Sequence, residues 1–152
     1  AMEAASLGIP ALAVSIQLEN DDYLGYSDKV DFSTAAIFTR RFAKVLLEKK
    51  MPEDVMILNV NVPYHAAPET GWRVTRLSRH PYFTATVKEP AKPGEKAQVE
   101  VRPTPHPDDL ADPTTDVSTF CKEKIVSVTP LSLDMTSRVN LGDLQKSFGL
   151  LD

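Results

Sequence analysis

Hydrophobic positions along the chain form short strand-like runs separated by stretches with helical spacing. The segments 11–18 and 55–62 are short, apolar and contain Val and Ile, which predicts two buried strands. Between them, apolar residues recur at helical spacing, which predicts a helix that Asp31 caps and that ends before Pro52. The order strand, helix, strand indicates an α/β sheet that is at least partly parallel.

Weaker patterns predict the remaining elements. Residues 1–7 favour a helix that closes at Gly8, and residues 72–77 favour a more polar strand. A final strand is predicted at 125–128, broken at Pro130. A last helix is predicted to start at Asn140, with one apolar stripe that consists of Leu141, Leu144 and Phe148.

The segment 82–113 has a different character. Six prolines lie between positions 90 and 113, and the alternating residues 98–102 are able to pair with 82–87 as an extended hairpin. We therefore expect three parts: an α/β core portion at 1–81, a protruding proline-rich hairpin arm at 82–113, and a final strand with the C-terminal helix at 114–152.

Composition narrows the possible functions. The net charge is −4, from 17 Lys and Arg against 21 Asp and Glu, which disfavours binding to a nucleic-acid duplex or to an anionic membrane. No apolar run is long enough to span a bilayer. The single cysteine, Cys121, excludes an internal disulfide and suits a reducing cytoplasm, so we expect a cytoplasmic protein with a buried or neutral thiol.

Few charged or ionisable residues are candidates for metal binding or catalysis. Asp21 and Asp22 follow the first strand and could reach one hard cation, but a solvated acidic loop is the favoured interpretation. Asp108, Asp109 and Asp112 lie in the arm, where exposed charge needs no function. The three histidines, His65, His80 and His106, show no ligand spacing, which argues against a zinc site.

Two asparagines are the better candidates for binding. Asn59 and Asn61 are predicted to project from one face near the carboxyl end of the strand at 55–62, where ligands of α/β sheets bind. Orienting a ligand and holding a neighbouring loop remain equally open roles. The segment 114–116 (TTD) is typical of turn and capping chemistry, and no dinucleotide, P-loop or hydrolase-elbow motif occurs.

Several stretches, taken in order, resemble one family. They are AMEAASLGIPALAVSI (1–16), DFSTAA (31–36), LNVNVP (58–63), VTRLSR (74–79), TTD (114–116) and VSVTPLSLDMT (126–136). Together they are similar to SurE, the survival protein family of 5'-nucleotidases, over nearly the whole chain. The pair LNVNVP and VSVTPLSLDMT is specific, because secondary structure alone does not explain either.

The resemblance implies a fold and a reaction. It implies a three-layer α/β/α, Rossmann-like core, a protruding β-hairpin and a C-terminal helix that exchanges between subunits of a homodimer or homotetramer. It also implies hydrolysis of nucleoside 5'-monophosphates with a divalent metal, Mg²⁺ or Mn²⁺. The metal would neutralise phosphoryl charge and activate water.

The sequence departs from the family at the metal site. The family's Asp-Asp pair, its further metal ligands and its phosphate-binding residues are expected N-terminal to Ala1, so we predict no catalytic residue and no metal ligand in this chain. Asn20, Asp21 and Asp22 imitate the NDDG motif, but Tyr23 replaces its glycine and the position is wrong, so the metal role is not transferred.

Three functional hypotheses follow. The chain is the C-terminal part of a metal-dependent nucleotidase, with Asn59 and Asn61 beside the substrate. Alternatively, it is a catalytically inactive oligomerisation or binding module that lacks the metal site. A third, weaker hypothesis makes Asp21 and Asp22 a relocated metal site.

Overall fold

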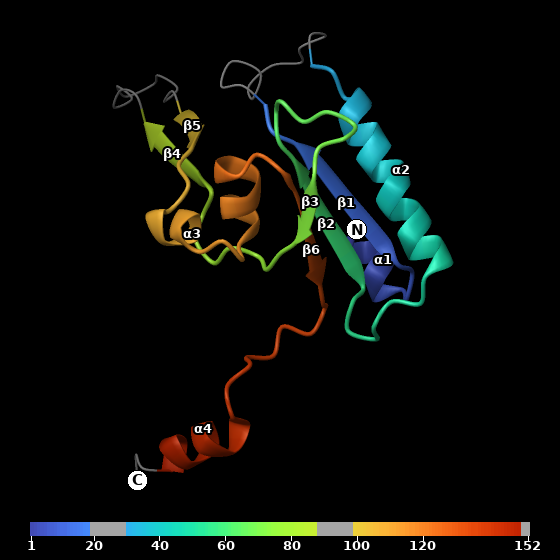
Figure 1. Ribbon diagram of the computed structural model, residues 1–152. Helices are drawn as coiled ribbons and strands as arrows, with labels where there is room; N and C mark the ends of the chain where they lie inside the picture. The colour runs from blue at the N-terminus through green and yellow to red at the C-terminus, as the bar shows by residue number, and fades with distance from the viewer. Residues whose placement is uncertain (19–29, 88–98, 150–152) are drawn as a thin grey trace, which may run out of the picture.

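The computed structural model describes residues 1–18, 30–87 and 99–149 (Figure 1). The elements, in chain order, are α1 (Met2–Ser6), β1 (Ala11–Ile16), α2 (Ser33–Glu48), β2 (Ile57–Val62), β3 (Trp72–Val74), β4 (Phe83–Val87), β5 (Val99–Pro103), α3 (Pro107–Ala111), η2 (Ser118–Lys122), β6 (Val126–Leu131) and α4 (Leu141–Phe148). The strands form a four-stranded sheet, in the order β1-β2-β6-β3, and a separate β4–β5 hairpin.

The unit β1–α2–β2 confirms the predicted strand, helix, strand order. β1 and β2 pair in parallel, from Ala11 opposite Ile57 to Ile16 opposite Val62, and α2 lies across one face of the sheet (Figure 1). The predicted cap of α2 is displaced by one residue, because Phe32 occupies the N-cap position. Asp31 instead accepts a hydrogen bond from the Ser33 amide at 2.8 Å, so its carboxylate still serves the start of the helix.

β6 makes the sheet mixed, because it runs antiparallel to β2 and parallel to β3. The prediction that this strand breaks at Pro130 is wrong, since β6 continues to Leu131 and Pro130 lies opposite Leu58. The Thr75 amide donates to the Val128 carbonyl, so the backbone N–H and C=O groups of even-numbered β6 residues point toward β3. β3 itself ends at Val74. The missing N–H of Pro130 therefore falls beyond β3 and removes no bond to β2.

β3 is shorter than the predicted strand at 72–77. β3 ends at Val74, and beyond it Arg76 forms an isolated parallel β-bridge with Thr115. From there the chain pairs with the 112–116 turn instead of with β6: the Arg76 amide donates to the Thr114 carbonyl and the Asp116 amide donates to the Arg76 carbonyl.

The hydrophobic core lies between the sheet and α2. Its buried members are residues whose side chains share this face, namely Ala35, Phe38, Phe42, Leu58, Val60, Val62, Val126 and Val128. Burial of these side chains provides the main stabilisation of the fold. On the opposite face of the sheet lie η2 and α3, which contact each other (Figure 1). η2 was not anticipated from the sequence.

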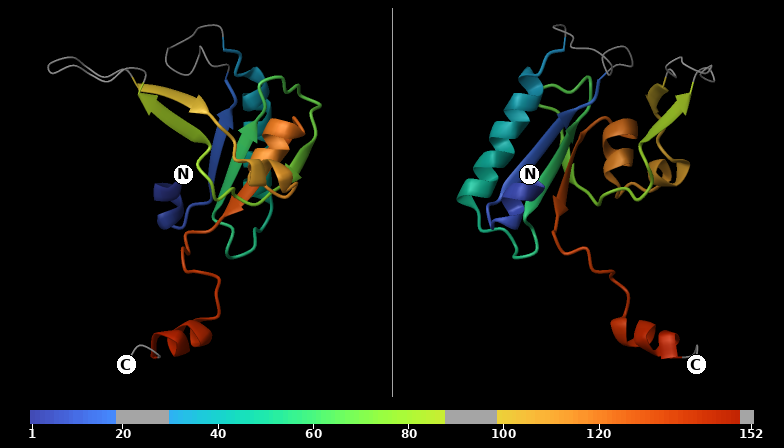
Figure 2. Two further views of the ribbon diagram at one scale, coloured as in Figure 1. Left: turned by 90° about the vertical axis from the view of Figure 1, so that its left-hand side faces the viewer. Right: turned by 180° about the vertical axis from the view of Figure 1, so that it is seen from behind.

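The predicted hairpin is confirmed. β4 and β5 pair antiparallel, with Phe83 opposite Pro103 and Val87 opposite Val99, and the hairpin projects away from the sheet (Figure 2). Its two strands are largely exposed. The division of the chain at 82 and 113 stays a prediction.

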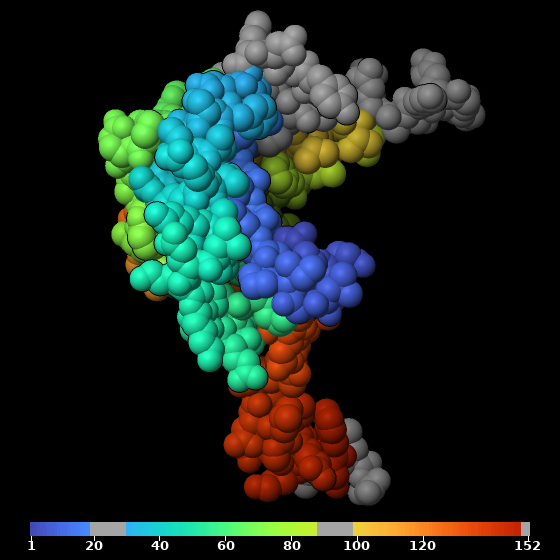
Figure 3. Space-filling model, turned by 90° about the vertical axis from the view of Figure 1, so that its right-hand side faces the viewer, coloured from blue at the N-terminus to red at the C-terminus, as the bar shows by residue number. Residues whose placement is uncertain are grey.

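The predicted C-terminal helix is also confirmed, as α4. Asn140 caps it by accepting a hydrogen bond from the Asp143 amide at 3.2 Å. None of its residues is buried, and Figure 3 shows α4 at the end of a narrow connection, away from α1 and α2. Among the described residues, no helix combines the length and apolar character that crossing a membrane requires.

Candidate functional site

A row of polar side chains crosses the sheet on the face opposite α2. Ser15, Asn61 and Ser127 are register partners on β1, β2 and β6, and we call these three residues the polar row. Along β2, Leu58, Val60 and Val62 are buried, while Asn59 and Asn61 are half-buried, as the alternation predicts for two asparagines on one face.

Asn61 is the centre of the polar row. Its Oδ1 accepts a hydrogen bond from the Ser15 hydroxyl at 2.7 Å, and its Nδ2 donates to the Ser127 hydroxyl at 3.2 Å. One amide N–H and one carbonyl lone pair remain for a further partner. Asn59 lies between Ala13 and Thr129 in the register and makes no side-chain hydrogen bond within the described part of the chain.

A pocket of about 230 Å³ opens beside Asn61, at the carboxyl ends of the parallel strands β1 and β2. Ser15, Gln17 and Asn61 supply its polar groups, and Tyr82, Phe83 and Phe120 supply aromatic rings. Sequence reasoning missed all of these except Asn61. The available signals were the adjacent aromatics Tyr82 and Phe83, and the place of Ser15 at the end of a strand parallel to β2. The pocket is smaller than the ~300 Å³ typical of whole-ligand sites, so it suits part of a ligand.

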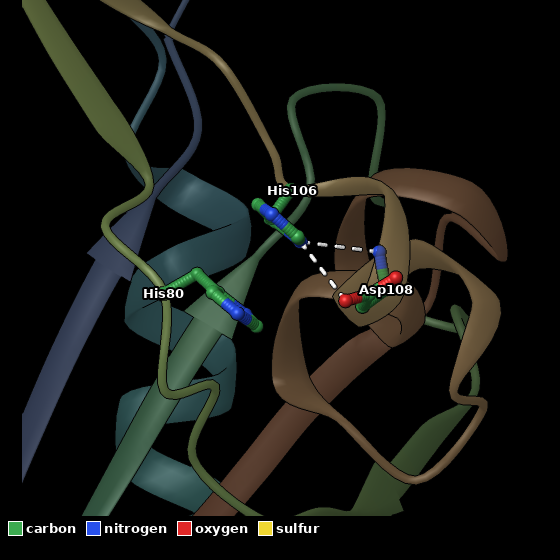
Figure 4. Close-up of side chains that lie close together, drawn as sticks. All are labelled: His80, His106 and Asp108. Carbon is green, nitrogen blue, oxygen red and sulfur yellow. Dashed lines mark hydrogen bonds and ion pairs between the residues drawn. The ribbon is translucent and has the colours of Figure 1, made fainter.

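The structure brings together two histidines that no spacing in the sequence pairs. The rings of His80 and His106 stack, with centroids 3.8 Å apart and an interplanar angle of 8°. One ligand atom from each of His80, His106 and Asp108 lies within 4.8 Å of the others (Figure 4). The lack of ligand spacing in the sequence therefore does not keep this pair apart in space, whereas His65 packs beside Tyr64 and is not in this group.

The acidic residues near α3 have different environments. Asp109 is 6% exposed, so the prediction of a solvated surface residue is wrong for it. Its carboxylate accepts a hydrogen bond from the Ser78 hydroxyl and lies 3.1 Å from His80 Nδ1. Burial opposes ionisation of Asp109, but the hydrogen bonds from Ser78 and His80 outweigh it and lower its pKa. Asp108 is exposed, as predicted.

Asp112 is held by the turn that follows α3. It accepts hydrogen bonds from the Thr114 hydroxyl at 2.6 Å and from the Thr114 amide at 2.8 Å, and it pairs with the Arg76 guanidinium. The Thr114 hydroxyl, followed by Arg76, lowers the pKa of Asp112 to about 2. The predicted exposed charge thus has a structural role.

The segment 114–116 forms the predicted turn and capping structure. The Thr115 hydroxyl accepts from the Ser118 amide at 3.1 Å, and Asp116 Oδ1 accepts from the amides of Ser78 and Val117. Burial raises the pKa of Asp116. These bonds join η2 to the chain after β3, so they fix the layer that lies over the polar face of the sheet.

Cys121 matches the expectation of a neutral thiol. It is half-buried, its Sγ lies 3.6 Å from the Tyr82 hydroxyl oxygen, and burial raises its pKa. A thiol with a raised pKa is a poor nucleophile at neutral pH.

The residues around the pocket do not by themselves fit Mg²⁺ or Mn²⁺. Both ions favour carboxylate oxygen, and the described residues that line the pocket offer hydroxyl, amide and aromatic groups only. Asp21 and Asp22 lie outside the described residues, so the rejection of their metal role, like the relocated-site hypothesis, stays untested.

Comparisons with known proteins agree on one relationship. The family profile described as Survival protein SurE matches residues 1–84. The chain is 38% identical over 154 residues to a "5'-nucleotidase SurE" from Thermococcus kodakarensis and 40% identical over 145 residues to one from Thermococcus gammatolerans. These alignments cover 96% and 95% of this chain, and 55% and 53% of the relatives.

A solved structure supports the same relationship. The fold is similar to the crystal structure of the SurE protein from Aquifex aeolicus, with a TM-score of 0.62 and 28% identity. That match covers 100% of this chain and 56% of the other. The chain thus spans about half the length of the relatives that it matches, and its sequence and its mixed four-stranded sheet with a hairpin agree in one assignment: it belongs to the SurE family.

Proposed function

We propose that the chain is the C-terminal part of a metal-dependent 5'-nucleotidase that hydrolyses nucleoside 5'-monophosphates to nucleoside and phosphate. The observation that carries this proposal is the 38–40% identity to proteins named 5'-nucleotidase, over at least 95% of the chain. The proposal includes the Rossmann-like three-layer core and a cytoplasmic location.

The pocket beside Asn61 is the proposed contact with substrate. It lies at the carboxyl ends of parallel strands, the usual place for ligands in α/β sheets. The aromatic rings of Phe83 and Phe120 offer stacking surfaces for a base, and the free N–H and lone pair of Asn61 are able to orient a polar group. Asn59, deeper along β2, supports this wall from the same face.

When bound in the complete site, the divalent metal supplies charge neutralisation and an activated water. This chain's residues bind and orient the nucleotide, because positioning provides much of the rate in phosphoryl transfer. The polar row is rigid, since Asn61 is held from both sides by Ser15 and Ser127. A fixed amide orients its ligand without first being ordered.

The test is phosphate release from nucleoside monophosphates, with Mn²⁺ and then with excess EDTA, by the complete protein of which this chain is the proposed C-terminal part, and by the chain alone. Turnover by the complete protein that EDTA abolishes, with none by the chain alone, supports the proposal, and turnover that persists in EDTA contradicts it. In an active preparation, Asn61→Ala and Gln17→Ala should lower kcat/KM about tenfold, the equivalent of about 1.4 kcal/mol. The matched control is Gln145→Ala, on the exposed helix α4.

A second candidate is a non-catalytic oligomerisation or binding module. One face of the hairpin consists of Phe83, Ala85, Val87, Val99, Val101 and Pro103, as the register shows. Four large apolar side chains on this face are between 39% and 59% exposed, namely Phe83, Val87, Val99 and Val101. A contiguous exposed apolar patch of this kind is typical of an interaction surface. Absence of turnover by the folded complete protein, together with self-association of the chain, would favour this candidate.

A further inference from the structure

Two chain segments bring nitrogen and oxygen ligands together beside the base of the hairpin. His80 lies between β3 and β4, while His106 and Asp108 lie at the start of α3 (Figure 4). One ligand atom of each lies within 4.8 Å of the others. The side chains of His80, His106 and Asp108 are 40%, 43% and 81% exposed, so an ion in solution is able to reach them.

His80 is held in the way that metal-binding histidines are usually held. Its Nδ1 lies 3.1 Å from the carboxylate of Asp109, a side chain that is 8% exposed and also hydrogen-bonded to Ser78. The ionised carboxylate only accepts hydrogen bonds, so it places the imidazole proton on Nδ1. Nε2 then keeps its lone pair, and a buried carboxylate behind the ring is the common outer-shell arrangement of metal sites.

His106 presents the other nitrogen together with Asp108. Its Nδ1 accepts a hydrogen bond from the Asp108 amide at 3.2 Å and lies 3.7 Å from Asp108 Oδ2. The lone pair is therefore on Nδ1, next to a carboxylate oxygen. An ion at this point would replace one long hydrogen bond at an exposed position.

The stacked rings must rearrange to bind one ion together. The lone pair of an imidazole lies in the ring plane, so two rings at an interplanar angle of 8° do not direct their lone pairs to one point. Asp109 fixes His80, so His106 is the ring that turns. Because His106 is half-exposed, the turn moves the ring through solvent and not through the core.

We propose that His80, His106 and Asp108 bind a borderline divalent transition metal such as Zn²⁺. Two imidazole nitrogens and one carboxylate oxygen are a typical zinc ligand set, which leaves a fourth position for water. Mg²⁺ prefers oxygen ligands and is not expected to compete. This proposal does not depend on the proposed nucleotidase function.

Calorimetric titration of the metal-free chain with Zn²⁺ tests the proposal. One Zn²⁺ is expected per chain, and an excess of Mg²⁺ should not displace it. His80→Ala, His106→Ala and Asp108→Asn should each weaken binding at least tenfold. His65→Ala is the matched control, because His65 lies outside the group, and it should leave binding unchanged.

Two further measurements keep the test independent of folding. Asp108 is exposed, so Asp108→Asn reports on the site even if a histidine variant unfolds. In NMR spectra, Zn²⁺ should shift the ring protons of His80 and His106, and not those of His65, as the stack opens. No binding by the intact chain, or equal binding by the His80→Ala/His106→Ala double variant when it is folded, would overturn the proposal. Neither result depends on the phosphate-release assay.

Discussion

At the scale of single residues, Asn61 links three strands through one amide group. Its bonds to Ser15 and Ser127 join β1, β2 and β6 on the face opposite α2. Ser127 is fully buried, so loss of the Asn61 amide would remove a hydrogen bond from a hydroxyl that water does not reach. This arrangement explains how a polar row is tolerated in the middle of a sheet.

Asn61→Ala is therefore expected to lower the free energy of unfolding by about 1–3 kcal/mol, because a buried partner is left unsatisfied. Urea denaturation measures the change. Asn59→Ala is the matched control, since Asn59 sits on the same face of β2 without such bonds in the described residues. Equal losses in the two variants would show that the polar row contributes no specific stability.

Asp108 and Asp109 are neighbours in sequence and opposites in environment. Asp109→Asn removes the charge that faces His80 and Ser78 in a buried position, and we expect a loss of about 1–3 kcal/mol. Asp108→Asn should stay within about 0.5 kcal/mol, because the side chain is exposed. Denaturation of both variants under the same conditions makes the comparison, and a reversed order would contradict the burial of Asp109.

The lowered pKa of Asp112 has a consequence in acid. A carboxyl whose pKa falls from 3.8 to about 2 on folding stabilises the folded state when ionised. That contribution is complete above about pH 4 and is lost as the pH falls toward 2. Asp112→Asn should therefore flatten the dependence of Tm on pH between 4 and 2, as thermal melts would show. If Asp112→Asn left the fall of Tm between pH 4 and pH 2 unchanged, titration of other groups would account for that fall.

At the scale of elements, β1 is an edge strand with two unlike sides. The Ala11 amide donates to the carbonyl of Met56, just before β2, and the Gln17 amide donates to the carbonyl of Val62 on β2, so the amides of odd-numbered β1 residues point to β2. The amides of Leu12, Val14 and Ile16 then point to the opposite side, where no strand of the described residues pairs with β1.

Hydrogen exchange should reveal this difference within one strand. The amides of Leu12, Val14 and Ile16 are expected to exchange faster than those of Ala13 and Ser15, because only the latter donate to β2. Residue-resolved exchange followed by NMR measures both groups together. Uniform protection along β1 would show that a further strand covers the edge.

The elements that sequence could predict are those with a local pattern. The alternation in β2 and the helical spacing of α2 follow from burial of one face, and the hairpin has the same alternation of apolar and polar positions. The course of β6 through Pro130 could not be predicted, because it depends on where β3 ends. The His80–His106 stack and the burial of Asp109 are also tertiary effects, created when α3 folds back onto the chain after β3.

At the scale of the whole molecule, two surfaces among the described residues expose large apolar side chains. One is the hairpin face, and the other is the stripe of α4, where Leu141 and Phe148 are 59% and 65% exposed. A helix of eight residues is marginal in isolation, so α4 needs a surface to pack against. We propose a homodimer or homotetramer in which α4 packs on another subunit.

Light scattering tests this assembly. The chain is expected to have at least twice the mass of a monomer, and deletion of residues 137–152 or the pair Leu144→Ser and Phe148→Ser should reduce it to a monomer. The matched control changes the polar side of α4, with Gln145→Ser and Lys146→Ser, and should leave the mass unchanged. A monomeric parent chain would contradict the assembly.

The open side of β1 also decides how the purified chain behaves on storage. An edge strand is a template to which another chain's strand is able to add. Such an encounter needs two molecules, so its rate rises with the square of the concentration, whereas unfolding of one molecule is independent of concentration. Dilution should therefore lengthen the time that the chain stays in solution.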